Sequence, residues 1–207
     1  RRKNVGEALL WSLLAGEATT TAITLAPLNP AEQTAYCRWQ EIANELNIPF
    51  LFEVGEAGGL SFEENLAAAD LMLTTSVAEG FGMVYLESWL AGRSLTGRDL
   101  PEITVDFTDA GIEFPDLYER LEIPSDWIGR SQFAETLQAE LAGVLKSFGL
   151  PPIDPTEWDG IVPRKIRNGC IDFGDLNEPM QEQIIRRVAT DASARTELLE
   201  RNRAIGA

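Results

Sequence analysis

Histidine is absent from this 207-residue sequence. The absence excludes Ser-His-Asp and Cys-His nucleophile systems, the HExxH zinc motif and acid-base catalysis by imidazole. Any chemistry must therefore use carboxylates, lysine, arginine or groups of the substrate itself.

Cysteine and long apolar runs are also scarce. Cys37 and Cys170 are lone residues far apart in the sequence, which excludes a zinc knuckle and a multi-disulfide framework, so we expect two buried, reduced thiols. The sequence has no run of about 18 or more apolar residues and no charged-then-apolar leader, which predicts no membrane span and no signal peptide. Both observations favour a cytoplasmic location.

Basic residues are outnumbered, with 17 Lys and Arg against 33 Asp and Glu, so the formal net charge is -16. A field of this sign opposes binding of a nucleic-acid backbone or an anionic membrane surface, and we expect no nucleic-acid partner. It still permits one nucleotide diphosphate, because a helix N-terminus and a few local cations can hold that group.

Hydrophobic patterning predicts alternating helices and strands in the first half of the chain. The apolar content of 44% is enough for one substantial core. Helices are expected at 5–15, 31–46, 62–69 and 82–92, and strands at 19–28, 49–54, 71–77 and 94–97. Ser61 and Glu64 form a capping-box pattern before the third of these helices. This alternation predicts an α/β fold with a Rossmann-like parallel sheet covered by helices on both faces.

The second half of the chain does not continue this alternation of helices and strands. A turn is expected at 98–102, an acidic and aromatic stretch at 106–126, and an amphipathic helix at 131–148. Prolines then break the chain before a long helix, expected at 178–203. We therefore predict a Rossmann-like domain at 1–150, and at 151–207 a Pro-rich connection and a C-terminal helix that packs on this domain or on a missing N-terminal domain.

The segment from Glu79 to Glu87 is the strongest candidate site. Open α/β sheets bind ligands at the carboxyl ends of their strands, and Glu79-Gly80-Phe81-Gly82 lies at such a strand-to-helix junction. The glycines allow a ligand to approach the backbone, Phe81 is expected to orient the loop by packing, and the Glu87 carboxylate can accept hydrogen bonds from a vicinal diol. Alternatively, these are ordinary turn glycines and Glu87 only interacts with the helix dipole.

The stretch from Ala69 to Ser76, followed by Glu79-Gly80-Phe81-Gly82, Glu87 and Gly92, resembles the C-terminal domain of retaining GT-B glycosyltransferases of the glycogen-synthase and sucrose-phosphate-synthase kind. The likeness extends over about residues 1–102. It implies a domain that binds a nucleotide-diphosphate sugar and transfers the sugar, with retention, to an unknown acceptor. It implies no metal and no cofactor other than this substrate.

The same resemblance implies roles for individual residues. Glu79 would lie by the donor sugar near the reacting anomeric carbon, and Glu87 would hold the donor ribose. Backbone amides around Phe81, Gly82 and Met83 would meet the sugar and diphosphate. Lys3 would neutralise the leaving diphosphate, and Arg1 or Arg2 would be its arginine partner, with Arg2 taken as the donor-binding residue.

The chain starts Arg1-Arg2-Lys3-Asn4, and we expect it to belong to a longer protein with an upstream N-terminal GT-B domain that binds the acceptor. A second hypothesis is a non-catalytic, degenerate transferase domain that serves binding or assembly. A third class, NAD-dependent or P-loop proteins, lacks the Gly-x-Gly-x-x-Gly and P-loop lysine motifs. The basic segment 163–168 either touches an anionic ligand or an acidic partner, or is simply structural, and the structural interpretation is favoured.

Overall fold

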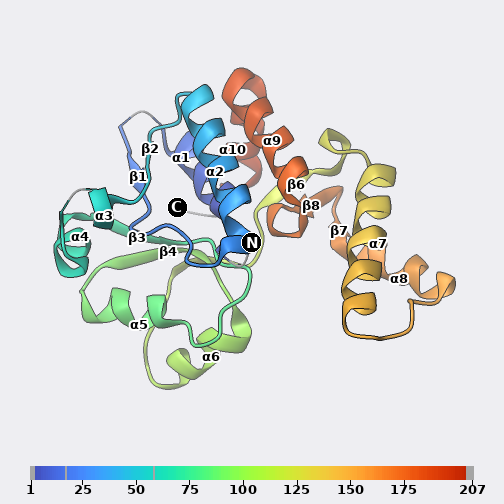
Figure 1. Ribbon diagram of the computed structural model, residues 1–207, viewed down its shortest axis with the longest axis horizontal. Coiled ribbons are helices and arrows are strands. Elements are labelled where there is room, and N and C mark those ends of the chain that lie inside the picture. The colour runs from blue at the N-terminus through green and yellow to red at the C-terminus, as the bar shows by residue number, and fades with distance from the viewer. Residues whose placement is uncertain (1–2, 17, 58, 204–207) are drawn as a thin grey trace.

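The computed structural model describes residues 3–16, 18–57 and 59–203 and has an α/β fold (Figure 1). In the first half, helices alternate with short parallel strands. These elements are α1 (Val5–Ala15), β1 (Thr21–Ala22), α2 (Pro30–Glu45), β2 (Phe50–Leu51), α3 (Val54–Ala57), α4 (Phe62–Ala68), β3 (Leu71–Thr74), α5 (Met83–Leu90), β4 (Ser94–Arg98), α6 (Pro101–Asp109) and β5 (Asp116–Tyr118).

The parallel strands form two small sheets. β1 pairs with β2, whereas β3, β4 and β5 form a three-stranded sheet in that order. The strand expected at 19–28 is much shorter, since β1 comprises only Thr21–Ala22, although the Ile23 N–H still donates to the Leu51 carbonyl at 2.9 Å beyond the end of β1. The parallel arrangement is thus present, but in smaller sheets than the sequence predicts.

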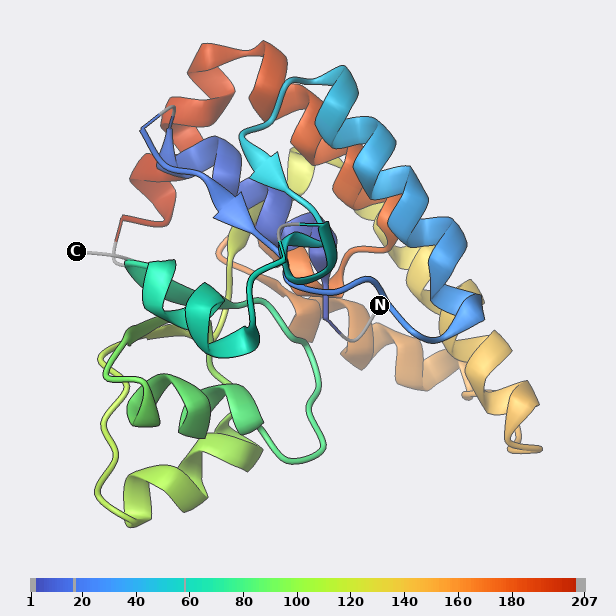
Figure 2. The same cartoon turned by 60° about the vertical axis from the view of Figure 1, so that its left-hand side comes forward.

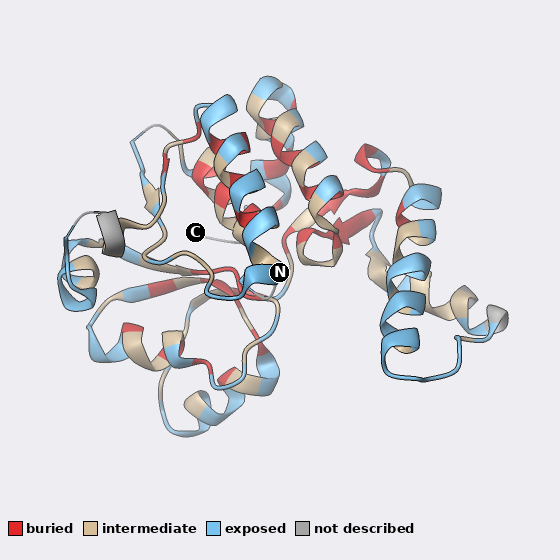
Figure 3. Ribbon diagram, in the orientation of Figure 1, coloured by how far each residue is buried: buried red, intermediate tan, exposed pale blue. Residues whose placement is uncertain are grey.

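The main core lies where α1 meets its neighbours. α1 contacts β1, α2 and α9 (Glu178–Thr190), and its residues Leu9 and Leu10 are fully buried. Figure 2 shows α1 behind β1, between α2 and the C-terminal helices. The colouring of Figure 3 places buried residues along these helices and β8. The C-terminal segment thus shares one core with the first helix.

Residues after 120 add an antiparallel sheet and further helices. Their bounds are β6 (Glu122–Pro124), a 3-10 helix (Ser125–Trp127), α7 (Arg130–Ser147), α8 (Pro155–Lys165), β7 (Ile166–Arg167), β8 (Cys170–Asp172), a second 3-10 helix (Phe173–Asp175), α9 and α10 (Ala192–Arg201). β8 lies between β6 and β7 and is antiparallel to both. α7 and α8 extend away from the parallel sheets, and Figure 3 shows α7 largely exposed.

Local sequence signals predict the helices better than they predict which strands pair with each other. The capping box is confirmed, since the Glu64 N–H donates to Ser61 Oγ at 3.2 Å and the Ser61 N–H donates to Glu64 Oε2 at 2.7 Å. The single helix expected at 178–203 is wrong. Asp191 is extended and its carboxylate accepts from the Ser193 N–H at 2.9 Å, so one helix ends and the capped α10 begins.

Two smaller expectations are corrected. Pro101 begins α6 rather than lying within a turn, because proline suits the first helical position. Cys37 is exposed on α2, whose buried face carries Tyr36, Trp39, Ile42 and Ala43, so only Cys170 is a buried thiol. In the described ranges no helix is both long and apolar enough to cross a bilayer.

Candidate functional site

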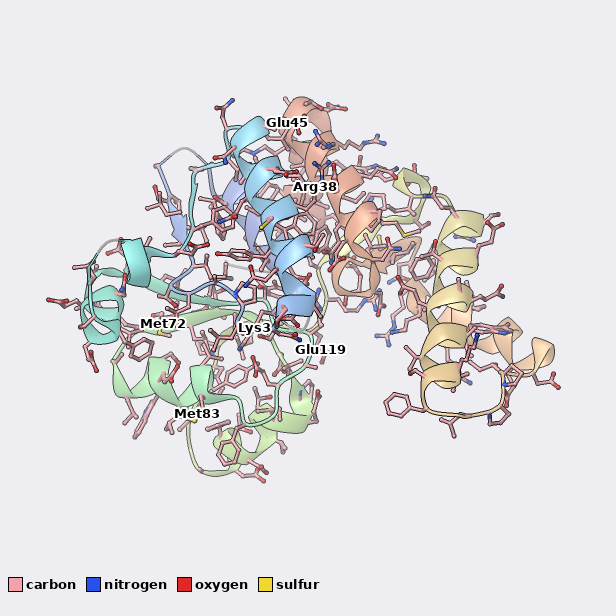
Figure 4. All side chains as sticks on the ribbon, viewed as in Figure 1. Lys3, Arg38, Glu45, Met72, Met83 and Glu119 are labelled. Carbon is pink, nitrogen blue, oxygen red and sulfur yellow. The ribbon has the colours of Figure 1, made fainter. Side chains whose placement is uncertain are left out.

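Lys3 and Glu79 meet at the carboxyl end of β3. Lys3 Nζ lies 2.5 Å from Glu79 Oε1, although the two residues are 76 positions apart. The Glu79 side chain is only 8% exposed, whereas that of Lys3 is 59% exposed. The structure therefore places a sheltered carboxylate beneath a cation that faces solvent (Figure 4 labels Lys3).

Hydroxyl groups at the end of β3 hold this pair in place. Ser76 Oγ donates to Glu79 Oε1 at 2.7 Å, and Thr75 Oγ1 donates to the Lys3 carbonyl at 3.0 Å. Both hydroxyl residues are buried. Sequence reasoning missed these two residues, although three consecutive hydroxyl residues after the apolar start of β3 were a visible signal.

Gly82 is required by the turn that starts α5. Its φ of 66° is left-handed, and a Cβ there would lie 2.4 Å from Ile103 Cγ2 and 2.8 Å from Tyr85 Cδ2. Gly80 is different, because a Cβ added there would meet nothing within 4 Å. The turn interpretation therefore holds for Gly82, while Gly80 leaves open space beside the loop.

Phe81 and Met83 are exposed beside this turn. Phe81 is 81% exposed, so the expectation that it orients the loop by packing is wrong. Met83 is 49% exposed at the first position of α5, where helical N–H groups lack intrahelical acceptors. Two exposed apolar side chains therefore lie between Glu79 and the body of α5, on either side of the buried Gly82.

Glu87 lies one turn along α5, on the same helical face as Met83. It is partly buried, and no hydrogen bond or ion pair joins its side chain to Lys3 or Glu79 in the described part of the chain. The predicted contacts of Arg1 and Arg2 fall outside the described residues. The structure thus unites Lys3 with Glu79 and sets Glu87 on the adjoining helix.

A buried ionic cluster lies at the end of the neighbouring strand β4, and sequence reasoning missed it. Arg98 donates through Nε and Nη2 to Glu7 Oε2 at 2.9 and 2.7 Å. It also donates through Nη1 and Nη2 to the Asp172 carboxylate at 2.8 and 2.7 Å. Glu7, on α1, is fully buried. The cluster therefore joins α1, β4 and β8.

One arginine shared by two carboxylates leaves an excess negative charge. Burial raises the pKa of Glu7 to about 7, although the charge of Arg98 and hydrogen bonds from Arg98 and Tyr118 act in the opposite direction. Burial opposes the charge of Arg98 as well, but the carboxylates of Asp172 and Glu7 raise its pKa. Burial thus favours the protonated form of Glu7, and Arg98 stays charged.

Among the residues that the structure describes, no group of three or more Cys, Asp or Glu side chains is placed to hold a metal ion. Comparisons with protein-family models, curated proteins and solved structures found no match. Function is therefore inferred from the residues and geometry of the site.

Proposed function

We propose that this chain is the donor-binding half of a retaining GT-B glycosyltransferase, which binds a nucleotide-diphosphate sugar and transfers its sugar to an acceptor held by an N-terminal domain. The observation that carries the proposal is the contact of Lys3 with Glu79 at the carboxyl end of a parallel strand, just before α5. Such strand ends are where open α/β sheets bind their ligands.

The proposed division of labour follows from charge and position. Lys3 and the free N–H groups of the first turn of α5 would bind the diphosphate, since both favour negative charge. The bond from the anomeric carbon to the diphosphate breaks while a bond to the acceptor oxygen forms on the same face of the sugar. Glu79 would stabilise the positive charge that develops on the sugar. Glu87 would accept hydrogen bonds from the ribose hydroxyls.

One observation favours the alternative of a non-catalytic binding module. Glu79 is nearly buried and already engaged by Lys3 and Ser76, as in a purely structural ion pair. The two functions differ in whether Lys3 exchanges Glu79 for a diphosphate and whether Glu79 affects turnover.

Replacing Lys3 with alanine should weaken binding of a nucleoside diphosphate by about 1.5–3 kcal/mol, the worth of a charge-assisted contact. Binding of the corresponding nucleoside should change little, because it has no phosphate. Titration calorimetry of the 207-residue chain with UDP, ADP and GDP and their nucleosides measures both effects. Lys146→Ala, which removes an exposed lysine from the last turn of α7, is the matched control. Equal losses for diphosphate and nucleoside would exclude Lys3 from the diphosphate site.

The two glutamates should separate kinetically in the enzyme that includes the acceptor domain. Glu79→Gln should lower kcat by about 10²-fold, since it removes a preorganised charge that acts mainly in the transition state. Glu87→Gln should mainly raise the donor KM, because the ribose is bound equally in the ground and transition states. Steady-state kinetics measure both, with the exposed Glu63→Gln as a control. Full kcat in the Glu79 variant, with donor affinity unchanged, would support the non-catalytic module.

A further inference from the structure

The side chain of Gln181 joins the C-terminal helix α9 to the start of the chain. Its Nε2 atom donates to Asn4 Oδ1 at 2.9 Å and to the Phe173 carbonyl at 3.1 Å. Gln181 is 1% exposed and Asn4 is 3% exposed, so these hydrogen bonds lie out of contact with water. Because a buried amide that loses its partner costs free energy, each residue holds the other in place. A contact between residues 177 positions apart therefore fixes where the chain enters α1.

Asn4 has an unusual backbone conformation at this entry. Its φ of 45° and ψ of 57° are left-handed, a region that asparagine adopts more readily than most residues. Among the described residues, its side chain makes no capping hydrogen bond with α1. Instead, Nδ2 donates to Glu7 Oε2 at 2.7 Å, while Oδ1 accepts from Gln181. Both ends of the Asn4 amide are thus held, one by α9 and the other by a carboxylate that Arg98 also binds.

Gly6 leaves room for Gln181 against the first turn of α1. A Cβ at Gly6 would lie 2.7 Å from Gln181 Oε1 and 2.9 Å from Trp39 Cη2. Both distances are shorter than a Cβ atom tolerates, so a larger residue would push the Gln181 amide or the Trp39 ring away. The close packing of Gln181 on α1 thus depends on a residue without a side chain.

Lys3 directly precedes Asn4, and its orientation depends on these contacts. Its carbonyl accepts from Thr75 Oγ1 at 3.0 Å, and its Nζ atom lies 2.5 Å from Glu79 Oε1. The Lys3 side chain is 59% exposed, so little packing restricts its long, flexible stem. The direction in which Lys3 extends is therefore set by its backbone, which is held at its own carbonyl by Thr75 and at the next residue by Gln181.

We propose that Gln181 and Asn4 are positioning residues for the donor site: through them, α9 holds Lys3 beside the Glu79 loop, where it meets the diphosphate. The inference rests on the proposed function, since it assigns both residues a role in diphosphate binding. Both are buried, so they act on the ligand through Lys3. A cation that is held in place before the ligand arrives loses less conformational entropy on binding, and the affinity is higher.

The test is titration calorimetry of the whole chain with UDP, ADP and GDP and with their nucleosides. Gln181→Met keeps the length of the side chain but removes its amide, so it should weaken binding of the nucleoside diphosphate about three- to tenfold. Nucleoside binding should change by less than about twofold, because a nucleoside has no phosphate to meet Lys3. In the Lys3→Ala background, Gln181→Met should have no further effect, since no lysine remains to be positioned.

Asn4→Gly is the second variant. Glycine keeps the left-handed conformation and is accepted at a helix N-cap, but it offers no amide to Gln181. It should therefore cause the same selective loss of about three- to tenfold. Circular dichroism and urea unfolding establish that each variant folds.

The matched control is Gln183→Met, the same substitution two residues along α9 at an exposed position. The Gln183 amide donates to the Trp127 carbonyl at 2.8 Å, so this variant likewise removes a hydrogen bond to the main chain. Because Gln183 does not contact Asn4, both affinities should stay within about twofold of those of the original chain.

The outcomes separate this inference from the proposed function. Equal weakening of diphosphate and nucleoside by Gln181→Met would overturn the inference, as would a loss of the same size in the Lys3→Ala background. Unchanged diphosphate affinity in Gln181→Met and Asn4→Gly, with a selective loss in Lys3→Ala, would overturn the inference and leave the proposed function standing. No selective loss in Lys3→Ala would overturn both.

Discussion

Replacing Arg98 with methionine should lower the free energy of unfolding by about 3–5 kcal/mol, the usual cost of removing one partner from a buried ion pair. The arginine side chain is only 5% exposed, and it binds the carboxylates of Glu7 and Asp172 together. Methionine fills much of the same volume but donates no hydrogen bond. Two buried carboxylates would then lie near each other without a cation, and the chain would have to protonate or expose them.

Urea unfolding followed by circular dichroism measures this loss. Arg130→Met is the matched control, because Arg130 is exposed at the start of α7, and its replacement should change stability by less than about 0.5 kcal/mol. Glu7→Gln tests the cause. It leaves Arg98 paired with Asp172, and because burial raises the pKa of Glu7 to about 7, a neutral side chain is less unfavourable here than at an ordinary carboxylate, so the change should cost only about 0.5–1.5 kcal/mol. If Arg98→Met costs no more than Arg130→Met, the cluster does not stabilise the fold.

Replacing Gly97 with alanine should destabilise the chain by about 3 kcal/mol or more, since backbone strain and steric overlap combine. Gly97 has a φ of 124°, which alanine rarely adopts, and it pairs with Thr74 across the β3–β4 ladder. A Cβ at Gly97 would lie 1.9 Å from the Thr74 carbonyl oxygen, well inside contact distance. The two strands would have to separate at the end that carries the Lys3–Glu79 pair.

The same substitution at Gly143 should have the opposite effect on stability. Gly143 lies within α7, and a Cβ added there meets nothing within 4 Å, so alanine should stabilise the chain by about 0.4–1 kcal/mol. Thermal and urea unfolding of both variants compare the two positions. A Gly97→Ala variant as stable as the original chain would mean that β3 and β4 are not packed as closely as this geometry requires.

The helices could be predicted from the sequence because their signals are local. The bounds of α1 agree with the expectation, and those of α2 and α7 differ from it by one residue at each end, since the spacing of apolar residues marks the buried face of each helix. The capping box of Ser61 and Glu64 depends on groups three positions apart. The strands β7 and β8 escaped prediction, since strand pairing depends on distant partners. The break at Asp191 was missed although its signal is local, because Asp191 caps α10 through the N–H of Ser193.

The candidate site, too, was only partly predictable from the sequence. Glu79 and the Gly82 turn were visible in the sequence, and the expectation that Lys3 and this loop bind the same donor molecule came from a family resemblance. The burial of Glu79 by Ser76 and Lys3 was not visible, nor was the exposure of Phe81. Side-chain exposure depends on which elements cover a loop, and a sequence pattern does not contain that information.

By itself, the sequence determined the α/β alternation, the positions of α1, α2 and α7, the lack of imidazole chemistry and a glycine-rich turn between two glutamates. Only the tertiary structure decided which charges are buried. It brought Arg98 to Glu7 and Asp172, which lie 91 and 74 positions away, and it brought Gln181 to Asn4, which lies 177 positions away. The physical reason is the separation along the chain over which each effect acts. Periodicity, caps and turns act over a few residues, whereas the desolvation of a charge depends on every element that packs around it.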